Sequence, residues 1–345
     1  MTRTSNQGLS RRMLLGATVL GFGGLGFAAS AGRARAQAPA ARPVTIANAS
    51  GLASFTMQEV LRQQGYMEEF GLKPETLNIG DGGKIVGGII GGNIDVSMLS
   101  GFAQIFPAIE RGAQLKVIAG GGMLPWQAVF TAKPEVRTLK DLEGKTVGTG
   151  SLGALLHQLM VALLQKHQVD VSKVRFVNIG GSVDIFRAVT AGTVDAGPGD
   201  LSLIDQQDEF KVRLLEHGNM AEELPEYTYQ GTWTSTRAIE GKRDVIVRSM
   251  AAYAKLYRFV QSPNSQEAFV RAQKTLFPRA PEDQAVTQWK YIQKYKTYNE
   301  ALVVSEERFN YMQKLNIEVQ SQRKVLPYSQ IADMSLAKEA LAMLG

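Results

Sequence analysis

The sequence contains no cysteine among its 345 residues. The chain therefore forms no disulfide, has no thiolate nucleophile and offers no cysteine for an iron–sulfur cluster or a lipid anchor. Histidine is scarce too, since His157, His167 and His217 are the only three. None stands in a metal-type cluster, and ten residues along one helical stretch separate His157 from His167, too far to share a metal ion. We expect solvated or packing roles for all three, and no metal or other cofactor.

Acidic residues are absent from the first 36 residues, which contain five arginines. The whole chain has a formal net charge of +6, but residues 37–345 hold 33 basic against 32 acidic side chains. A charge near zero gives no electrostatic argument for binding nucleic acid or an anionic membrane surface.

The same segment has the form of an export signal. Residues 10–15, SRRMLL, match a twin-arginine pattern, a glycine-rich apolar run extends from Leu14 to Ala31, and a small-x-small site at residues 34–36 precedes Gln37. Its glycines and short length make a poor membrane-spanning helix. We expect residues 1–36 to be a cleaved Tat signal peptide and the mature chain to be periplasmic. The Sec route and a membrane anchor are the alternatives.

Residues 145–159, KTVGTGSLGALLHQL, have the pattern of a strand, a glycine turn and a helix. Glycines allow the backbone to approach a ligand, Ser151 can cap the helix, and first-turn N–H groups carry a partial positive charge. The stretch predicts either a cradle for a small polar group, with the helix starting at Leu152, or an ordinary strand-to-helix turn with a capping serine.

A similar unit stands 100 residues earlier in the chain. Residues 50–54 align with residues 150–154 without gaps, the tripeptide Asn-Ile-Gly at 78–80 recurs at 178–180, and Asp95 recurs as Asp195. Strand and helix patterns alternate in the same order in both halves, which predicts two α/β lobes of like topology. Ligands bind beyond the carboxyl ends of strands in open α/β sheets, so two facing lobes would enclose one.

We expect the first lobe to comprise residues 44–125 and 234–345, and the second residues 126–233. The chain should cross between the lobes near residues 123–133 and return near residues 228–236. From Asp244 onward the pattern is helical, and these helices should buttress the first lobe.

Three short motifs carry a resemblance to a known family: GGNIDV at 91–96, GTGSLGALLH at 148–157 and AGTVDA at 191–196. With them the sequence resembles the solute-binding proteins of ABC importers of the sulfonate, nitrate and thiamine-precursor type, the SsuA and NMT1-like group, up to about residue 275. The resemblance implies a type II periplasmic-binding-protein fold, with two βα lobes, two crossover strands and a helical C-terminal region. It also implies a small-molecule ligand and an ABC permease as partners, and we expect a monomer.

The resemblance further implies ligand contacts at the ends of the strands in both lobes. The residues concerned are Asn48, Ser50, Leu52, Ser100 and Phe102 in the first lobe and Gly150, Ser151, Leu152, Gly153 and Ser182 in the second. Asp200 lies where family members often carry an aromatic-acid-proline sequence, and it either contacts the ligand or caps a helix. Lys84 and Arg187 either meet an anion or are solvated.

The charge of the ligand is predicted from the two glycine turns of the second lobe, at 150–151 and 180–182, which contain no acidic residue. Helix N-termini favour anions, so we expect a sulfonate or carboxylate with Ser151 as a donor and Phe102 or Trp126 covering its apolar part. Asp81 and Asp200 support the alternative, a cationic or neutral hydrogen-bond donor.

Three classes of function fit such a fold. A binding protein for an importer is the first. A thiamine-pyrimidine-synthase-like enzyme is the second, but those enzymes carry a cysteine-rich iron-binding stretch and this chain has no cysteine. No Ser/His/Asp or paired-carboxylate arrangement stands out either, so we expect no enzymatic activity. A ligand-sensing module for a receptor is the third.

Overall fold

A computed structural model describes residues 41–101 and 103–345. The expectations for the signal peptide and for Phe102 therefore lie outside the described residues. No helix among the described residues is both long and apolar enough to cross a membrane.

The first lobe is built on a five-stranded sheet of order β2-β1-β3-β10-β4. β1 runs parallel to β2 and β3, whereas β10 is antiparallel to β3 and β4. The strands are β1 (Arg42–Ala49), β2 (Leu72–Ile79), β3 (Val96–Ser100), β4 (Leu115–Gly120) and β10 (Gly231–Ser235). The helices between them are α1 (Leu52–Gln63), α2 (Tyr66–Glu69), α3 (Gly82–Gly91) and α4 (Ile105–Glu110).

The second lobe repeats this order. The strands are β5 (Gln127–Thr131), β6 (Thr146–Thr149), β7 (Arg175–Asn178), β8 (Gly197–Asp200) and β9 (Arg213–Asn219). β7 pairs with β6, β5 lies between β8 and β9, and a parallel bridge from Val147 to Ala196 joins β6 to the start of β8. The resulting order, β7-β6-β8-β5-β9, matches that of the first lobe, with an antiparallel crossover strand in the fourth place of each. The prediction of two lobes with like topology is confirmed.

The repeat extends to individual hydrogen bonds. Asp95 Oδ2 accepts from Thr45 N at 2.9 Å, and Asp195 Oδ2 accepts from Thr146 N at 2.8 Å. In each lobe the carboxylate thus ties the start of the third strand to the start of the first. Asp95 and Asp195, 100 residues apart, therefore stabilise the same pairing of strands in the two lobes.

Helices and short 3-10 turns complete the second lobe and the C-terminal region. The second lobe contains η1 (Leu139–Leu142), α5 (Leu155–Lys166), η2 (Val171–Lys173), α6 (Ser182–Thr190), η3 (Leu201–Gln206), α7 (Gln207–Phe210) and α8 (Met220–Glu223). The C-terminal region contains α9 (Thr236–Val260), η4 (Pro263–Ser265), α10 (Gln266–Leu276), α11 (Glu282–Tyr295), α12 (Glu306–Glu318), α13 (Tyr328–Ile331) and α14 (Ser335–Ala342).

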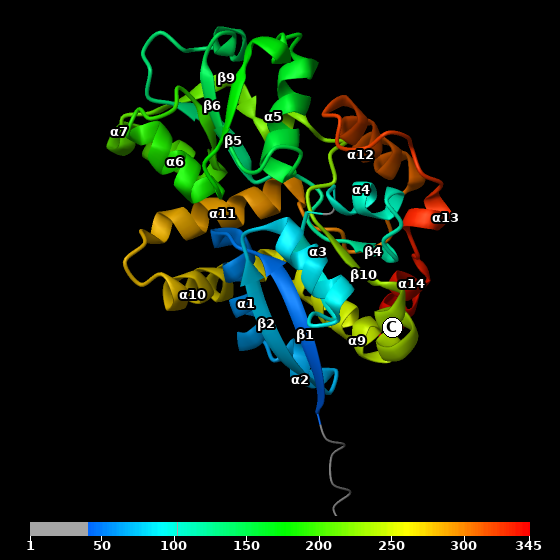
Figure 1. The fold of residues 1–345 in the computed structure, drawn as a ribbon. Coiled ribbons are helices and arrows are strands. Elements are labelled where there is room, and N and C mark those ends of the chain that lie inside the picture. The colour runs from blue at the N-terminus through cyan, green and yellow to red at the C-terminus, as the bar shows by residue number, and fades with distance from the viewer. Residues whose placement is uncertain (1–40, 102) are drawn as a thin grey trace, which may run out of the picture. The chain divides into compact units, whose positions relative to one another are not determined.

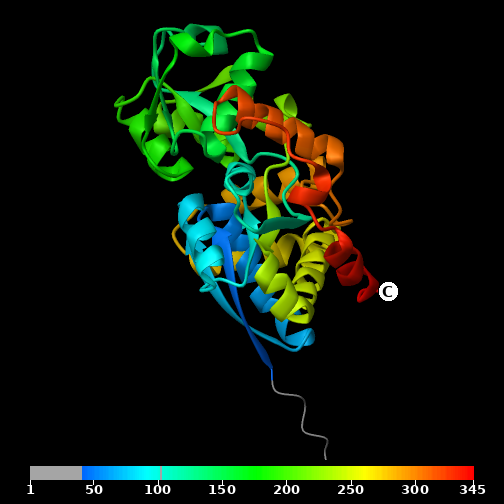
Figure 2. The ribbon, with the colours of Figure 1, turned by 45° about the vertical axis from the view of Figure 1, so that its right-hand side comes forward.

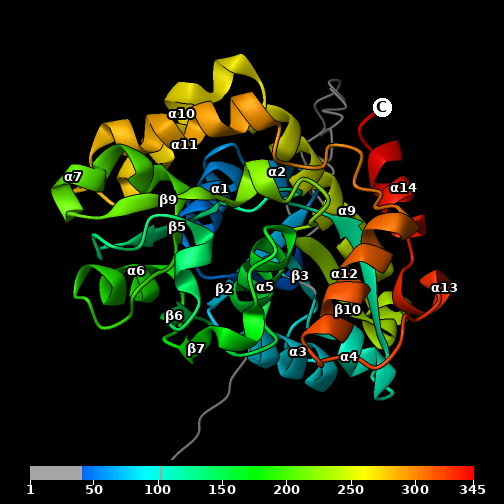
Figure 3. The same ribbon diagram turned by 90° about the horizontal axis from the view of Figure 1, so that it is seen from above.

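The C-terminal helices contact both lobes, which the sequence did not predict. α9 and α14 pack on the first sheet and α10 packs on α1, whereas α11 contacts η3 and α12 contacts α5 of the second lobe. Figure 1 shows the second-lobe elements in green and α1, β1, β2 and α3 in blue and cyan, with α11 in orange between the two groups and α12 in darker orange beside α5 and α4. The two groups remain distinct in Figure 2, and Figure 3 shows α11 and α12 on different sides of α5.

Candidate functional site

The carboxyl ends of the strands from the two lobes meet at one place. The backbone of Gly101, which follows β3, is packed against Leu155, the first residue of α5: a Cβ atom on Gly101 would lie 3.5 Å from Leu155 Cβ. The loop after β3 in the first lobe therefore lies next to the start of α5, which follows the loop after β6 in the second lobe. This is the edge at which α/β sheets bind their ligands.

Two helices, α1 after β1 and α5 after β6, both begin without a capping side chain. Gly51 is the N-cap of α1 and Ala154 is the N-cap of α5, neither makes a side-chain cap bond, and neither helix has an acidic residue in its first turn. First-turn N–H groups have no intrahelical acceptor. They remain available as donors at both helix starts.

The helices α3 and α6, which follow β2 and β7, do have acidic side chains at their N-termini. Asp81 caps α3, accepting from Gly83 N at 2.8 Å, and Asp184 lies in the first turn of α6. Each N-terminus therefore has a carboxylate of its own, which opposes the binding of an anion there. The turn at 180–182 is therefore the less favourable of the two predicted anion positions, and its contact with a ligand stays a prediction.

The loop at 150–153 differs from its prediction. α5 begins at Leu155 and not at Leu152, and Ser151 does not cap it. The reason is Gly153, which adopts a left-handed φ of +78° and donates its N–H to His157 Nδ1 at 3.0 Å. Burial lowers the pKa of His157, which keeps the imidazole neutral and able to accept this bond. The loop is thereby held open as a separate turn before the helix.

Ser151 is exposed on this loop and keeps a free donor. Its hydroxyl oxygen accepts from Asn178 Nδ2 at 3.3 Å, which leaves the hydroxyl hydrogen for another partner. Gly150 packs against the backbone of the neighbouring 180–182 turn, since a Cβ there would lie 3.4 Å from Gly180 O. Leu152 is 66% exposed, an unusual state for a leucine. The loop thus offers polar donors and an apolar surface side by side.

Among the other predicted contacts, Ser50 is exposed, and Leu52 and Ser182 are partly buried at the starts of α1 and α6. Asn48 and Ser100 are buried, and protein groups use their hydrogen bonds. Asn48 Oδ1 accepts from Leu99 N at 3.0 Å, and Ser100 Oγ accepts from Trp233 Nε1 at 3.0 Å. The two side chains hold the strand ends together, and their contact with a ligand stays a prediction.

Asp200 lies at the end of β8 and caps η3. Its Oδ1 accepts from Ser202 N at 3.0 Å, Ser202 Oγ at 2.6 Å and Gln288 Nε2 at 3.4 Å. Burial raises the pKa of this carboxyl. No basic side chain forms an ion pair with it in the part of the chain that the structure describes.

Trp126 lies beside Asp200. Its carbonyl oxygen accepts from Leu201 N at 2.8 Å, and its ring centroid is 4.9 Å from that of Tyr291. Trp126 is 2% exposed, and its Nε1 is buried without a hydrogen-bond partner among the described residues. A cavity of about 250 Å³ lies beside the contact of η3 with α11, lined by Trp126, Leu201, Ser202, Gln288 and Tyr291 among others. The structure therefore groups Trp126 with Asp200, at the bridge between the second lobe and the C-terminal helices.

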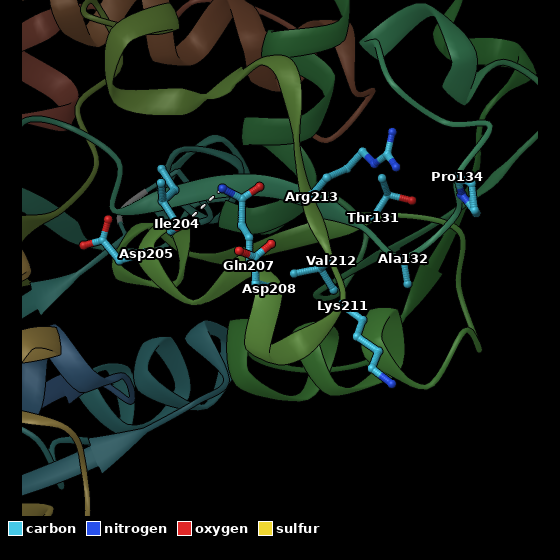
Figure 4. A pocket seen from close by; sticks show the side chains of 10 residues that line it. All are labelled: Thr131, Ala132, Pro134, Ile204, Asp205, Gln207, Asp208, Lys211, Val212 and Arg213. Atoms are coloured by element: carbon cyan, nitrogen blue, oxygen red, sulfur yellow. Dashed lines mark hydrogen bonds between the residues drawn. The ribbon is translucent and has the colours of Figure 1, made fainter.

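A larger cavity, of about 600 Å³, is shown in Figure 4. All of its lining residues lie between Thr131 and Arg213, so it belongs to the second lobe alone. It cannot hold a ligand shared between the lobes.

The sequence missed one cluster. His167 and His217 stack with ring centroids 4.7 Å apart, and both contact Glu223. The expectation that no histidine stands in a metal-type cluster is therefore wrong. The sequence could not predict this cluster, because 50 residues separate His167 from His217 in the chain. Only the spacing of His157 and His167, which share a helical stretch, could be judged from the sequence.

Solved structures of low sequence identity share the fold. The alkanesulfonate-binding protein SsuA from Xanthomonas axonopodis pv. citri, bound to MOPS, aligns with a TM-score of 0.69 at 16% identity, over 85% of this chain and 99% of that one. The nitrate-binding protein NrtA from Synechocystis PCC 6803 gives 0.67 at 10% identity, covering 89% of each chain. A DszB mutant in complex with biphenyl-2-sulfinic acid gives 0.60 at 11%, over 88% of this chain and 99% of that one.

No curated protein matches the sequence. The model of the NMT1/THI5-like family, in contrast, matches residues 54–265, a range that begins within α1 and includes the loops after β3 and β6. By that match, and with the two-lobed periplasmic-binding-protein fold described above, the chain belongs to the NMT1/THI5-like family.

Proposed function

We propose that this protein is a periplasmic solute-binding protein that captures a small organic anion, a sulfonate or a carboxylate, between its two lobes and delivers it to an ABC importer. The observation that carries the proposal is the pair of uncapped helix starts, α1 and α5, at equivalent positions of the two lobes. Each favours an anion by up to about 1 kcal/mol, and a hydrogen bond to a charged group adds about 1.5 to 3 kcal/mol.

The side chains around the α5 start support the same ligand. Ser151 keeps a hydroxyl hydrogen to donate, and Leu152 presents an apolar surface beside it. An organic anion has both a charged head and an apolar body, so it would use both groups. A binding site needs few polar contacts if they are placed at the charged end of the ligand.

Asp200 is the residue that would favour the alternative, a ligand that is a cation or a neutral hydrogen-bond donor. A buried carboxylate without an ion-pair partner attracts a cation or a hydrogen-bond donor. Its Oδ1, however, already accepts from three donors of the protein, two of them on Ser202 at the start of η3. We therefore assign Asp200 a capping role and place the anion at the helix starts.

The solved structures with this fold include binding proteins for alkanesulfonate and nitrate, and a DszB mutant bound to a sulfinic acid. All of these named ligands are anionic, which supports the charge that we propose. An enzymatic role is not proposed, because the chain has no cysteine and the titratable groups at the described strand ends form no nucleophile–base pair.

The proposal is tested by thermal shift with a panel of sulfonates, carboxylates, nitrate, pyrimidines and amines. A ligand that binds the folded state raises the melting temperature by mass action, by an amount that grows with its concentration. We expect the sulfonates or carboxylates to give the shift and to be recovered unchanged. A shift from amines alone, or chemical conversion of a bound compound, would contradict the proposal.

A further inference from the structure

Three elements of the second lobe converge on one point away from the strand-end loops. His167 is the C-cap residue of α5, His217 lies within β9, and Glu223 ends α8. His167 Nε2 is 2.9 Å from Glu223 Oε2, and His217 Nδ1 is 2.9 Å from Glu223 Oε1. One donor atom from each residue lies within 4.8 Å of the other two.

A bulge in β9 brings His217 to this point. Ala128 of β5 pairs with Asn219 while Phe130 pairs with Leu214, so extra residues of β9 loop out between the two pairs. His217 has a left-handed φ of +58°, and the next residue must be glycine, since a Cβ on Gly218 would lie 2.8 Å from Leu215 O. Bulges and strained residues that are held by their surroundings concentrate at functional sites.

The three donors match the needs of a transition-metal ion. Two imidazole nitrogens and one carboxylate, with a fourth position open, form a set that Zn²⁺ uses at bond lengths of about 2.0 to 2.2 Å. Tetrahedral geometry with such bonds places donor atoms roughly 3.3 Å apart. The two separations of 2.9 Å join each imidazole to a different oxygen of Glu223, and the three donor atoms lie within 4.8 Å of one another, so adjustments of the side chains would bring all three to tetrahedral spacing around one ion.

The surroundings of the cluster supply access and support. A cavity of about 530 Å³ adjoins it, lined in part by His217, Glu223 and Arg213, and would leave room for water at an open position. The second ring nitrogen of His217 lies 3.9 Å from Glu216 Oε1, which is beyond hydrogen-bond distance, but this carboxylate adds negative charge beside a bound cation. Lys166 Nζ, 3.6 Å from Glu223 Oε2, is the one opposing charge in contact with the carboxylate among the described residues.

We propose that His167 Nε2, His217 Nδ1 and the Glu223 carboxylate bind one divalent transition-metal ion of the Zn²⁺ class, at a site separate from the proposed anion site. The two histidines come from separate elements, α5 and β9, and the bulge in β9 turns the side chain of His217 toward His167. Both imidazoles then bind through the nitrogen that now faces Glu223.

The test is calorimetric titration of ZnCl2 into the chain purified without a polyhistidine tag. We expect a saturable isotherm with one Zn²⁺ per chain. His217→Asn, which tolerates the left-handed φ, and Glu223→Gln, which keeps the shape of the side chain, should each raise the Kd at least tenfold, about the minimum effect of disturbing a metal site. Glu226→Gln, at an exposed glutamate three residues from Glu223, is the matched control and should bind as the unaltered chain does.

Co²⁺ provides a second readout, because imidazole and carboxylate ligation in a four-coordinate site gives it intense visible absorption that a loosely held ion lacks. Melting curves without metal show whether each variant is folded. One folded variant of the two, His217→Asn or Glu223→Gln, is enough for the test. Absence of saturable Zn²⁺ binding by the unaltered chain overturns the proposal. So does equal binding by the unaltered chain and a folded ligand variant, which would place the ion elsewhere.

Discussion

Asn316 of α12 connects the two lobes through a buried network, and its replacement by alanine gives a stability prediction that the structure quantifies. Its Nδ2 donates to Ala103 O at 2.8 Å and to Gln322 Oε1 at 3.1 Å. Its Oδ1 accepts from Gln158 Nε2 of α5. Asn316 and Gln158 are 0% exposed, so water does not reach these atoms in the folded state.

Asn316→Ala leaves three buried polar atoms without partners: the Ala103 oxygen, Gln322 Oε1 and Gln158 Nε2. Each unsatisfied group costs about 1 to 3 kcal/mol, and partial relaxation brings the expected total to about 3 to 5 kcal/mol of unfolding free energy. Unfolding entropy is about 2.1 cal/mol/K per residue, so a unit of roughly 300 residues loses about 1.5 °C per kcal/mol. The melting temperature should fall by about 5 to 8 °C.

Differential scanning calorimetry of the ligand-free protein measures this fall. Lys314→Ala, an exposed position on the same helix, is the matched control and should change the stability by less than about 0.5 kcal/mol. If Asn316→Ala melted within the range of the Lys314 control, the network would not carry the stability that its burial implies.

Two further predictions concern Asp200 and export. Burial raises the pKa of the Asp200 carboxyl, so its charge costs stability at neutral pH and that cost disappears as pH falls below the ordinary value of 3.8. Asp200→Asn keeps the bonds to Oδ1 and should raise the melting temperature at pH 7, with the gain shrinking toward pH 3.8; a constant or absent gain would refute this. Replacing Arg11 and Arg12 by lysine should block export, and unchanged periplasmic yield of the double variant would remove the Tat route.

The architecture could be predicted from the sequence because both lobes repeat the same order of strands and helices. The pairs Asp95 and Asp195 stand at matched positions, and in the structure both carboxylates make the same hydrogen bond to the start of the first strand. Alternating strand and helix patterns then determine which strands are neighbours, because each crossover is short. The antiparallel place of β5 and β10 in the two sheets could not be read from the sequence, since it follows from how the lobes are joined.

The strand-end loops were located from the sequence, but the direction of their side chains was not. Asn48 and Ser100 stand at the predicted strand ends yet turn inward, because Leu99 N and Trp233 Nε1 require acceptors there. The start of α5 was misplaced by three residues, because the contact of Gly153 with His157 holds the chain out of the helix. Such choices depend on partners distant in the sequence or on one backbone angle.

The cluster of His167, His217 and Glu223 shows the limit of reasoning from spacing. Its members come from α5, β9 and α8, and only the bulge in β9 turns His217 toward the others. A one-residue change in strand pairing would reverse the side on which this histidine lies. Pattern and propensity do not predict such bulges.

We propose that the anion is held at the start of α5, and calorimetry of the tightest-binding ligand with two variants of the protein tests this directly. Ser151→Ala should weaken binding about tenfold, or about 1.4 kcal/mol, because the hydroxyl hydrogen is lost, while Asp200→Asn should bind as well as the unaltered chain or better. Ser329→Ala, an exposed serine on α13, is the control. Tight binding of an amine or a neutral heterocycle, lost in Asp200→Asn and kept in Ser151→Ala, would contradict the claim.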